Sequence, residues 1–270
     1  MNYKLVAIDL DDTLLADDLT ISPQTVEAMR EATNQGVTVT LATGRMFQSA
    51  VQYAISIELD VPIITYQGAY IKNVLSEEVV FERLVPYKLS VKLIQDLRKK
   101  NKHIQIYLND ELYVEQDNNY IRDYSKASNV PYIVVDDLLE QMKQSHTEPI
   151  KILIIDDPAE IQKLKTEYQQ EYKERLHITL SKPHFLEITH PEATKGNAIR
   201  YLAEQKGITM EQVIAIGDSY NDRDMIELAG LGVAMGNGRQ EIKDIANYVT
   251  KTNNDHGVWE VFQKFVLQSR

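Results

Sequence analysis

The sequence of 270 residues contains no cysteine, and this absence narrows the chemistry that the protein can use. Disulfide bonds and thiolate metal sites are excluded, which fits a reducing compartment. Long apolar runs are missing as well, since no uninterrupted stretch approaches the length that crosses a membrane. We see no basic-then-apolar leader before the first expected strand. We therefore expect a cytoplasmic protein.

Positive charge is in deficit. The chain has 29 Lys and Arg against 40 Asp and Glu, a formal net charge of −11. Such a protein repels nucleic-acid backbones and anionic membranes, so we expect neither as a partner. An anionic substrate would need local positive charge or a metal ion to attract it. The hydrophobic share of 43% is ordinary for a globular protein, and the length allows two domains.

Several well-known motifs are also absent. The sequence has no P-loop and no dinucleotide-binding fingerprint. Ser219 is not in a nucleophile elbow, because the position two residues later is not glycine. The acidic run that begins at Asp9 is not a calcium loop, because Leu14 and Thr20 stand where that loop requires Gly and Glu.

The front of the chain alternates strands and helices. The apolar run Leu5–Ile8 predicts a strand covered on both faces. Ser22 as N-cap and Pro23 at the first helical position predict the start of a helix. Two more strands are expected at 37–42 and 61–65. Strands joined through helices lie parallel, in an open sheet whose ligands bind beyond the carboxyl ends of the strands.

The middle of the chain has another pattern. Asn109-Asp110 between two apolar runs predicts a hairpin of strands 104–108 and 112–114. Helical and extended stretches then alternate, so an α+β insert with its helices on one sheet face is expected. The expected helices are 88–100, 118–128 and 158–172, and the expected strands are 132–135, 150–155 and 176–180.

The doubly wound pattern then resumes, with a helix at 195–205 and strands at 212–216 and 232–235. The predicted fold is therefore an α/β protein with a Rossmann-like parallel-sheet core formed by residues 1–83 and 187–270. An α+β cap domain, residues 84–186, is inserted into this core. An insert of this kind can act as a lid and select the substrate.

The run Asp9-Leu10-Asp11-Asp12-Thr13 directly follows the first strand and is the most informative feature of the chain. Carboxylates at the end of a buried strand are costly unless a cation or a reacting group offsets their desolvation and repulsion. Two carboxylates separated by one residue can flank a small electrophile, one attacking while the other transfers protons. An isolated acidic run is often only a polar loop, so the rest of the chain has to decide.

Three further segments support a catalytic interpretation. Thr43-Gly44-Arg45 follows a strand and can hold a phosphate, although Thr-Gly also makes ordinary turns. Lys195 begins a helix, where the dipole disfavours it; it either shares an anion with backbone N–H groups or is a solvated surface lysine. The segment 217–222 places more carboxylates after a third strand, and an all-oxygen site without His or Cys suits Mg²⁺.

As an ordered set, these four segments resemble the motifs of the haloacid dehalogenase-like superfamily of phosphohydrolases. The place of the insert, with Phe185-Leu186-Glu187-Ile188 leading back to the core, resembles the Cof-type subfamily with a large α/β cap. Two departures are visible. Asp12 stands where many relatives carry Gly, and Tyr66-Gln67-Gly68 stands where Cof-type relatives usually read Asn-Gly.

The resemblance implies a role for each site residue. Asp9 attacks phosphorus and becomes an aspartyl-phosphate, while Asp11 protonates the leaving alcohol and later deprotonates water. Mg²⁺ would be held by the carboxylates of Asp9 and Asp218 and the backbone carbonyl of Asp11, with Asp222 supporting the metal shell. Arg45 would contact substrate or form a salt bridge from core to cap. The phosphoryl oxygens would be held by Leu10 N–H, Thr43, Gly44 N–H, Lys195 and Asn221.

We therefore expect a magnesium-dependent phosphatase for small phosphorylated metabolites, with sugar phosphates favoured, acting as a monomer or homodimer. Two alternatives remain open. A phosphomutase of the same superfamily would keep the nucleophile but exclude water and return the phosphoryl group. A non-catalytic phosphoacceptor or metabolite-binding module would need neither a proton donor at Asp11 nor a lid.

Overall fold

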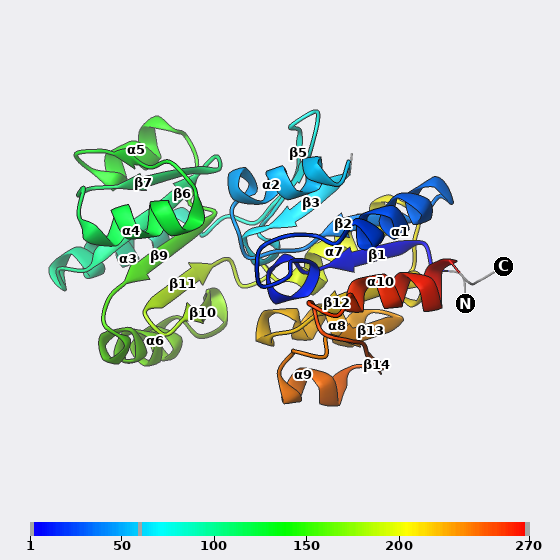
Figure 1. Ribbon diagram of the computed structural model, residues 1–270. Coiled ribbons are helices and arrows are strands. Elements are labelled where there is room, and N and C mark those ends of the chain that lie inside the picture. Colours follow the sequence, from blue (N-terminus) through cyan, green and yellow to red (C-terminus); the bar gives the residue numbers. More distant parts are fainter. Residues whose placement is uncertain (1–2, 59–60, 268–270) are drawn as a thin grey trace. The chain divides into compact units, whose positions relative to one another are not determined.

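The computed structural model describes residues 3–58 and 61–267. The chain divides into two compact units (Figure 1). The first, which we call the core, comprises Met1–Val80 and Thr194–Arg270, and the second, which we call the cap, is Phe81–Ala193. The predicted fold class, a doubly wound α/β core interrupted by an inserted cap domain, is confirmed.

The core is built on a five-stranded parallel sheet in the order β14-β13-β12-β1-β2. The strand β1 lies between two neighbours, and every one of its residues is buried, as expected for an unbroken apolar run with both faces covered. The strands are β1 (Leu5–Ile8), β2 (Thr38–Leu41), β12 (Val213–Gly217), β13 (Leu231–Ala234) and β14 (Tyr248–Val249).

A second sheet, of three strands, continues from the core sheet. It contains β3 (Pro62–Thr65), β4 (Tyr70–Asn73) and β5 (Val79–Glu82), in the order β3-β4-β5. A single parallel bridge between Ala42 and Ile64 links it to the end of β2. The sequence predicted β3 but neither β4 nor β5.

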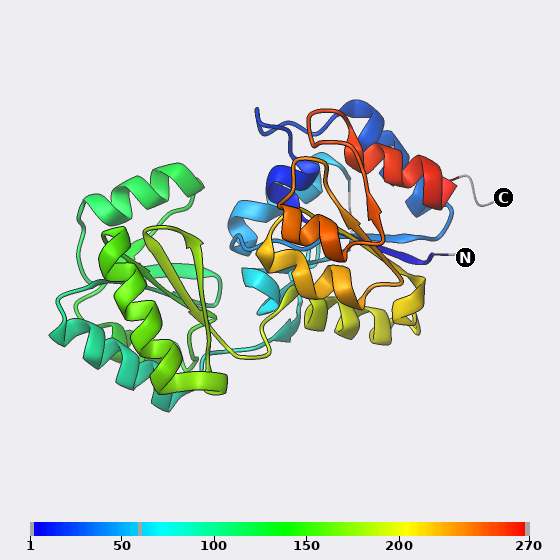
Figure 2. The same ribbon diagram turned by 90° about the horizontal axis from the view of Figure 1, so that it is seen from below.

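The helix α1 begins as its sequence indicates. The Ser22 hydroxyl accepts a hydrogen bond from the Thr25 N–H at 3.3 Å, and Pro23 is the first helical residue. After the helix, Gly36 takes a φ of +85°, which favours glycine. The helices of the core are α1 (Pro23–Asn34), α2 (Phe47–Ser56), α7 (Lys195–Gln205), α8 (Arg223–Leu228), α9 (Gln240–Ile245) and α10 (Gly257–Val261). Figure 2 shows α1 and α10 on one face of the core sheet, and α7 and α8 on the other.

The cap has a six-stranded sheet in the order β10-β11-β9-β6-β7-β8, antiparallel except between β7 and β8. The predicted hairpin joins β6 to β7, and both turn residues, Asn109 and Asp110, have positive φ, as a tight hairpin turn requires. The strands are β6 (His103–Leu108), β7 (Glu111–Val114), β8 (Ile133–Val134), β9 (Lys151–Ile155), β10 (His177–Lys182) and β11 (Phe185–Thr189).

The two faces of the cap sheet differ. The helices α3 (Tyr87–Lys99), α5 (Leu138–Gln144) and α6 (Pro158–Tyr172) pack apolar side chains against one face. The fourth helix, α4 (Asn119–Ser128), departs from the expectation that all helices lie on that face. Its Tyr124 hydroxyl accepts a hydrogen bond at 2.8 Å from Tyr107, whose side chain alternates away from the apolar cluster. The sequence did not predict α5.

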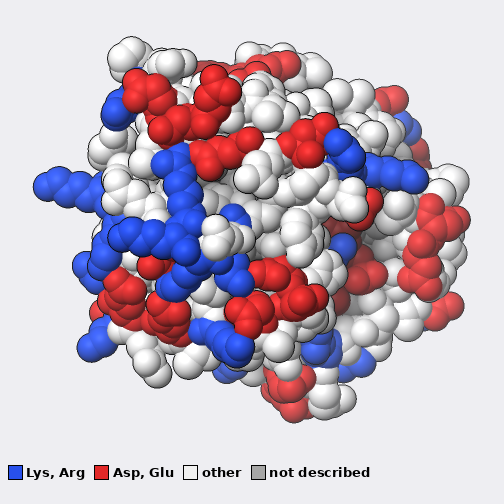
Figure 3. All heavy atoms as spheres, turned by 90° about the vertical axis from the view of Figure 1, so that its left-hand side faces the viewer, with Lys and Arg blue, Asp and Glu red and all other residues white. Residues whose placement is uncertain are grey.

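Ion pairs cover part of the cap surface. Lys100 pairs with Glu167 at 2.6 Å, and Lys102 pairs with Asp156 at 2.6 Å. In Figure 3, Lys and Arg side chains gather in one half of the view and are bordered by Asp and Glu.

Within the part of the chain that the structure describes, no helix combines the length and apolar character that spanning a bilayer requires.

Candidate active site

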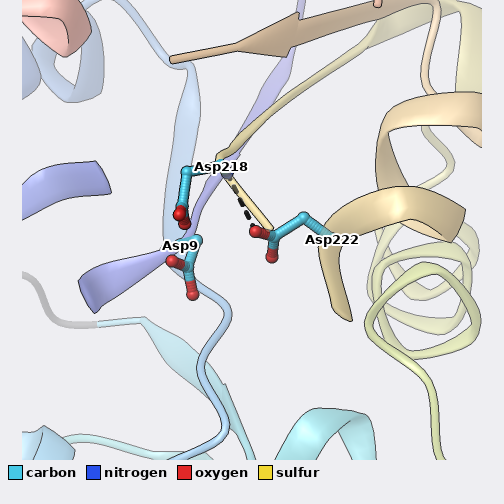
Figure 4. A group of neighbouring side chains, drawn as sticks. All are labelled: Asp9, Asp218 and Asp222. Atoms are coloured by element: carbon cyan, nitrogen blue, oxygen red, sulfur yellow. Dashed lines mark hydrogen bonds between the residues drawn. The ribbon is translucent and has the colours of Figure 1, made fainter. Parts of the chain in front are cut away.

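Three aspartates meet at the carboxyl edge of the core sheet. Carboxylate oxygens of Asp9, Asp218 and Asp222 all lie within 4.8 Å of one another (Figure 4). The pairing of the strands explains why such distant residues meet. Because β1 and β12 are parallel and in register, with Ile8 opposite Ile216, the chain leaves both strands at the same edge. The predicted convergence of the first and fourth segments is therefore seen in the structure.

Lys195 lies at the centre of this cluster and is fully buried. Its Nζ lies 2.5 Å from Asp9 Oδ1 and 2.6 Å from Asp222 Oδ1. The Thr194 hydroxyl caps α7 by accepting a hydrogen bond from the Asn197 N–H at 3.3 Å, which starts the helix at Lys195. Of the two interpretations of Lys195, the solvated surface lysine is wrong.

The carboxylate of Asp222 is held on both oxygens. Its Oδ2 accepts hydrogen bonds from the N–H groups of Asp218 at 2.9 Å and Ser219 at 3.0 Å, and its Oδ1 contacts Lys195. Gly217 allows this close approach, since a Cβ there would lie 2.5 Å from the Cβ of Asp222. The Asp218 carboxylate instead accepts a hydrogen bond from the Thr13 hydroxyl at 3.3 Å.

The charges of the cluster do not balance. Burial raises the pKa of Asp9 well above its ordinary value, repulsion from Asp222 adds to the rise, and Lys195 offsets part of it. Burial also raises the pKa of Asp218 to about 7, with repulsion from Asp222 as the next cause. For Lys195, burial acts to lower the pKa, but attraction to Asp222 and Asp9 outweighs burial and the pKa is raised. One ammonium thus faces three carboxylates, and an all-oxygen donor set with surplus negative charge can bind a hard metal ion.

Asp11 lies apart from the acidic cluster and pairs with Arg45. The Arg45 guanidinium donates from Nε to Oδ2 at 2.9 Å and from Nη2 to Oδ1 at 2.5 Å, a two-point contact that fixes the carboxylate plane. The guanidinium carbon also lies 5.1 Å from the centre of the Tyr53 ring. The sequence suggested a substrate contact or a core-to-cap salt bridge for Arg45; in this structure its carboxylate partner is Asp11.

The loop that carries Asp11 turns sharply after the nucleophile candidate. Asp12 adopts a φ of 56°, in the left-handed region, and its carbonyl accepts a hydrogen bond from Asn237 Nδ2 at 2.7 Å. Leu10, whose N–H was expected to help hold a phosphate, is fully buried next to Asp9.

The other expected phosphate-binding residues lie on two loops of the core. Thr43 is fully buried, and its hydroxyl accepts a hydrogen bond from the Arg45 N–H at 3.1 Å. Asn221 is exposed, and its Nδ2 donates to Gln67 Oε1 at 3.1 Å. Gln67 also lies against Gly44, so it connects the two loops. Sequence reasoning assigned Gln67 no role; its departure from the family pattern was the only signal.

A family model described as haloacid dehalogenase-like hydrolase matches residues 6–262. The chain therefore belongs to the haloacid dehalogenase-like hydrolase family. A Bacillus subtilis protein named 5-amino-6-(5-phospho-D-ribitylamino)uracil phosphatase YcsE is 34% identical over 269 residues, which cover 99% of this chain and 97% of that protein. The Bacillus subtilis protein named phosphatase YwpJ is 30% identical, covering 94% of this chain and 97% of its own.

Solved structures agree with this assignment. A crystal structure of a Thermotoga maritima protein superposes with a TM-score of 0.88 at 34% identity and covers 97% of each chain. A Bacteroides thetaiotaomicron protein described as a haloacid dehalogenase-like hydrolase superposes with a TM-score of 0.87 at 31% identity, over 97% of this chain and 99% of that one. With relatives named as phosphatases along nearly the whole length, the chain is an enzyme of the phosphatase class.

Proposed function

We propose that the protein is a magnesium-dependent phosphomonoester hydrolase that acts on small phosphorylated metabolites through an aspartyl-phosphate on Asp9. One observation carries the proposal: the buried Asp9, which directly follows β1, contacts Lys195 and has a carboxylate oxygen within 4.8 Å of one from Asp218. This arrangement offers an oriented nucleophile beside positive charge and a place for a cation.

Asp9 performs the first step. Lys195 holds one carboxylate oxygen, so the second oxygen is oriented to attack phosphorus in line. A bond forms between this oxygen and phosphorus while the bond to the substrate alcohol breaks. The attack of an anion on an anionic phosphate is opposed by like charge, and the Lys195 ammonium reduces that opposition. Thr43, Gly44 N–H, Leu10 N–H and Asn221 hold the phosphoryl oxygens.

Asp11 handles the protons. It donates a proton to the departing alkoxide, and it then takes a proton from the water that attacks the phosphorus of the aspartyl-phosphate. The second attack breaks the bond to Asp9, releases inorganic phosphate and restores the carboxylate. In this structure both Asp11 oxygens accept hydrogen bonds from Arg45, so Asp11 has to leave this contact and take up a proton before it can act as the acid.

The donor set fits Mg²⁺. The carboxylates of Asp9 and Asp218 and the backbone carbonyl of Asp11 would hold the ion. Asp222 would support them indirectly, because both of its oxygens already accept hydrogen bonds. When bound, the ion neutralises charge on the transferring phosphoryl group.

For the substrate we propose small phosphorylated metabolites, with sugar phosphates as the first class to test. The name of YcsE describes a phosphatase for a phosphorylated ribityl compound, which supports a phosphorylated polyol or sugar. We propose that the cap, residues 84–186 as expected from the sequence, selects among such substrates.

The test is a panel of phosphorylated sugars, nucleotides and cofactors, assayed for released inorganic phosphate with Mg²⁺ and with a chelator. The proposal predicts phosphate release from a subset of the panel and none after chelation. Analysis of the organic product separates hydrolysis from a mutase reaction. A product that keeps its phosphate at another position would overturn the hydrolase assignment, and undiminished release without metal would overturn the metal assignment.

A further inference from the structure

The turn Tyr66–Gly68, which follows β3, has an unusual backbone. Tyr66 and Gln67 have φ values of 52° and 60°, so two consecutive residues other than glycine lie in the left-handed region. L-residues with a side chain adopt this conformation rarely, and it persists only where the surroundings enforce it. Such a turn next to candidate phosphate-binding loops indicates that it positions a side chain there.

Backbone contacts fix the turn to two of the motif segments. The Tyr66 N–H donates to the Arg45 carbonyl at 2.9 Å, and the Gln67 N–H donates to the Thr43 carbonyl at 3.1 Å. Gly68 lies so close to the start of α7 that a Cβ there would be 2.1 Å from the Thr194 carbonyl oxygen. The turn is therefore held between the Thr43–Arg45 loop and the segment that begins α7 at Lys195.

The side chain of Gln67 reaches a third motif segment. Its Oε1 accepts the hydrogen bond from Asn221 Nδ2 at 3.1 Å. Its other amide atom lies directly over Gly44, since a Cβ there would be 2.3 Å from Gln67 Nε2. Within the residues that the structure describes, Gln67 is the hydrogen-bonding partner that fixes the rotation of the exposed Asn221 amide.

We propose that Gln67 is a positioning residue of the phosphatase site, which holds the Asn221 amide beside Gly44 so that both can bind the same phosphoryl group. The proposal rests on the proposed function, because it assumes that Asn221 and Gly44 contact the phosphoryl oxygens. The bent backbone at Tyr66 and Gln67 serves to aim this side chain at the two loops.

The first test replaces Gln67 with Met, which keeps the length of the side chain and removes the amide. The expected result is a fall in kcat/KM of about tenfold, the usual scale for losing one hydrogen bond to a charged group. Competitive inhibition by inorganic phosphate should weaken in parallel, while the melting temperature stays unchanged. The matched control is Gln240→Met, since Gln240 is an exposed glutamine of the core that bonds Asp244 at 2.7 Å, and it should leave both readouts unchanged.

A double-mutant cycle then separates positioning from a general structural effect. If Gln67 acts through Asn221, the double variant Gln67→Met/Asn221→Ala should be no worse than Asn221→Ala alone. Gly44→Ala approaches the same contact from the other side, because its methyl group must displace the Gln67 amide. Gly44→Ala should lower kcat/KM less in the Gln67→Ala background than in the wild type, and this comparison keeps the proposal testable if Gln67→Met does not fold.

Wild-type kcat/KM and phosphate inhibition in Gln67→Met, or additive losses in the cycle, would overturn the proposal while leaving the phosphatase function intact. Failure of the wild-type protein to hydrolyse any phosphomonoester would instead overturn the proposed function. The two failures are therefore distinguishable in the same set of assays.

Discussion

The core and the cap each bury a lysine against carboxylates, and the comparison shows what distinguishes a reactive site from a structural ion pair. In the core, Lys195 contacts Asp9 and Asp222 where two strands end and α7 begins. In the cap, Lys151 is 2% exposed and lies on β9, within the sheet, with its Nζ 3.3 Å from Glu187 Oε1. The Lys151 ammonium also lies 4.8 Å from the centre of the Tyr107 ring.

The difference lies in the balance of charge. For Lys151, burial acts to lower the pKa, but the interactions with Glu187 and Tyr124 together outweigh burial and the pKa is raised. One buried carboxylate, that of Glu187, balances the charge of this lysine. In the core, one lysine faces three carboxylates, and the pKa of Asp9 is raised. Surplus negative charge at a sheet edge indicates a place for a cation, whereas a balanced pair indicates a structural role.

The largest effect is expected from Asp9, the proposed nucleophile of the core. Asp9→Asn should lower kcat by about 10³-fold or more, because an amide oxygen is too weak a nucleophile, while the protein stays folded. Steady-state kinetics on an aryl phosphate and circular dichroism check both parts. The matched change in the cap is Glu187→Gln, which should lower the melting temperature. Full activity in Asp9→Asn would remove the contrast between the two sites.

Metal removal should affect the core site and not the ion pair of the cap. Chelation should stop turnover, and Mg²⁺ should restore it. Added Mg²⁺ should raise the melting temperature of the wild type, because binding to the folded state stabilises it by about 2.7 kcal/mol at a hundredfold excess over Kd. Calorimetry with Asp218→Asn as the control should show no such rise. An equal rise in that variant would show that the ion binds elsewhere.

The ion pair of Lys151 with Glu187 in the cap should affect the free energy of unfolding. Lys151→Met leaves a buried carboxylate without its partner and should destabilise the protein by about 3–5 kcal/mol. The double variant Lys151→Met/Glu187→Leu should recover most of this loss, because it removes both charges. Urea unfolding measures the three free energies. A double variant as unstable as the single one would contradict the view that the pair only balances itself.

A smaller effect on stability is expected when the pH is lowered. Burial lowers the pKa of His103 in the cap from 6.5 to about 4. Below about pH 6.5, His103 therefore binds a proton in the unfolded chain but stays neutral in the folded cap. The free energy of unfolding should fall as the pH drops from about 6.5 toward 4. His103→Gln should flatten this dependence in calorimetry at several pH values. Exposed His146→Gln is the control, and an equal flattening there would argue against His103 as the cause.

The sequence predicted the parts of the fold that depend on long apolar runs and definite turn signals. The strand β1 and the hairpin at Asn109-Asp110 are examples. It missed β5 and α5, which are short and carry mixed side chains; Val79 of β5 is 42% exposed. It placed α4 on the wrong face of the cap sheet, because the contact with Tyr107 depends on which face each strand residue takes.

The candidate site also has features that the sequence could predict and features that it could not. Asp9 and Asp218 could be predicted together because each follows an apolar strand, and parallel strands bring their carboxyl ends to one edge. The pair of Arg45 with Asp11 and the contact of Gln67 with Asn221 could not be predicted. They depend on side-chain rotamers. The contact of Gln67 also depends on a left-handed backbone conformation, which the sequence does not indicate because residue 67 is not glycine.

The central claim is that Asp9 is the nucleophile. Its most direct test is mass spectrometry of enzyme that is quenched with acid during turnover and then digested. The account predicts covalent phosphate on the peptide that contains Asp9, present in the wild type and missing in Asp9→Asn. Phosphate on another residue, or steady turnover with an Asp9 peptide that never carries phosphate, would contradict it.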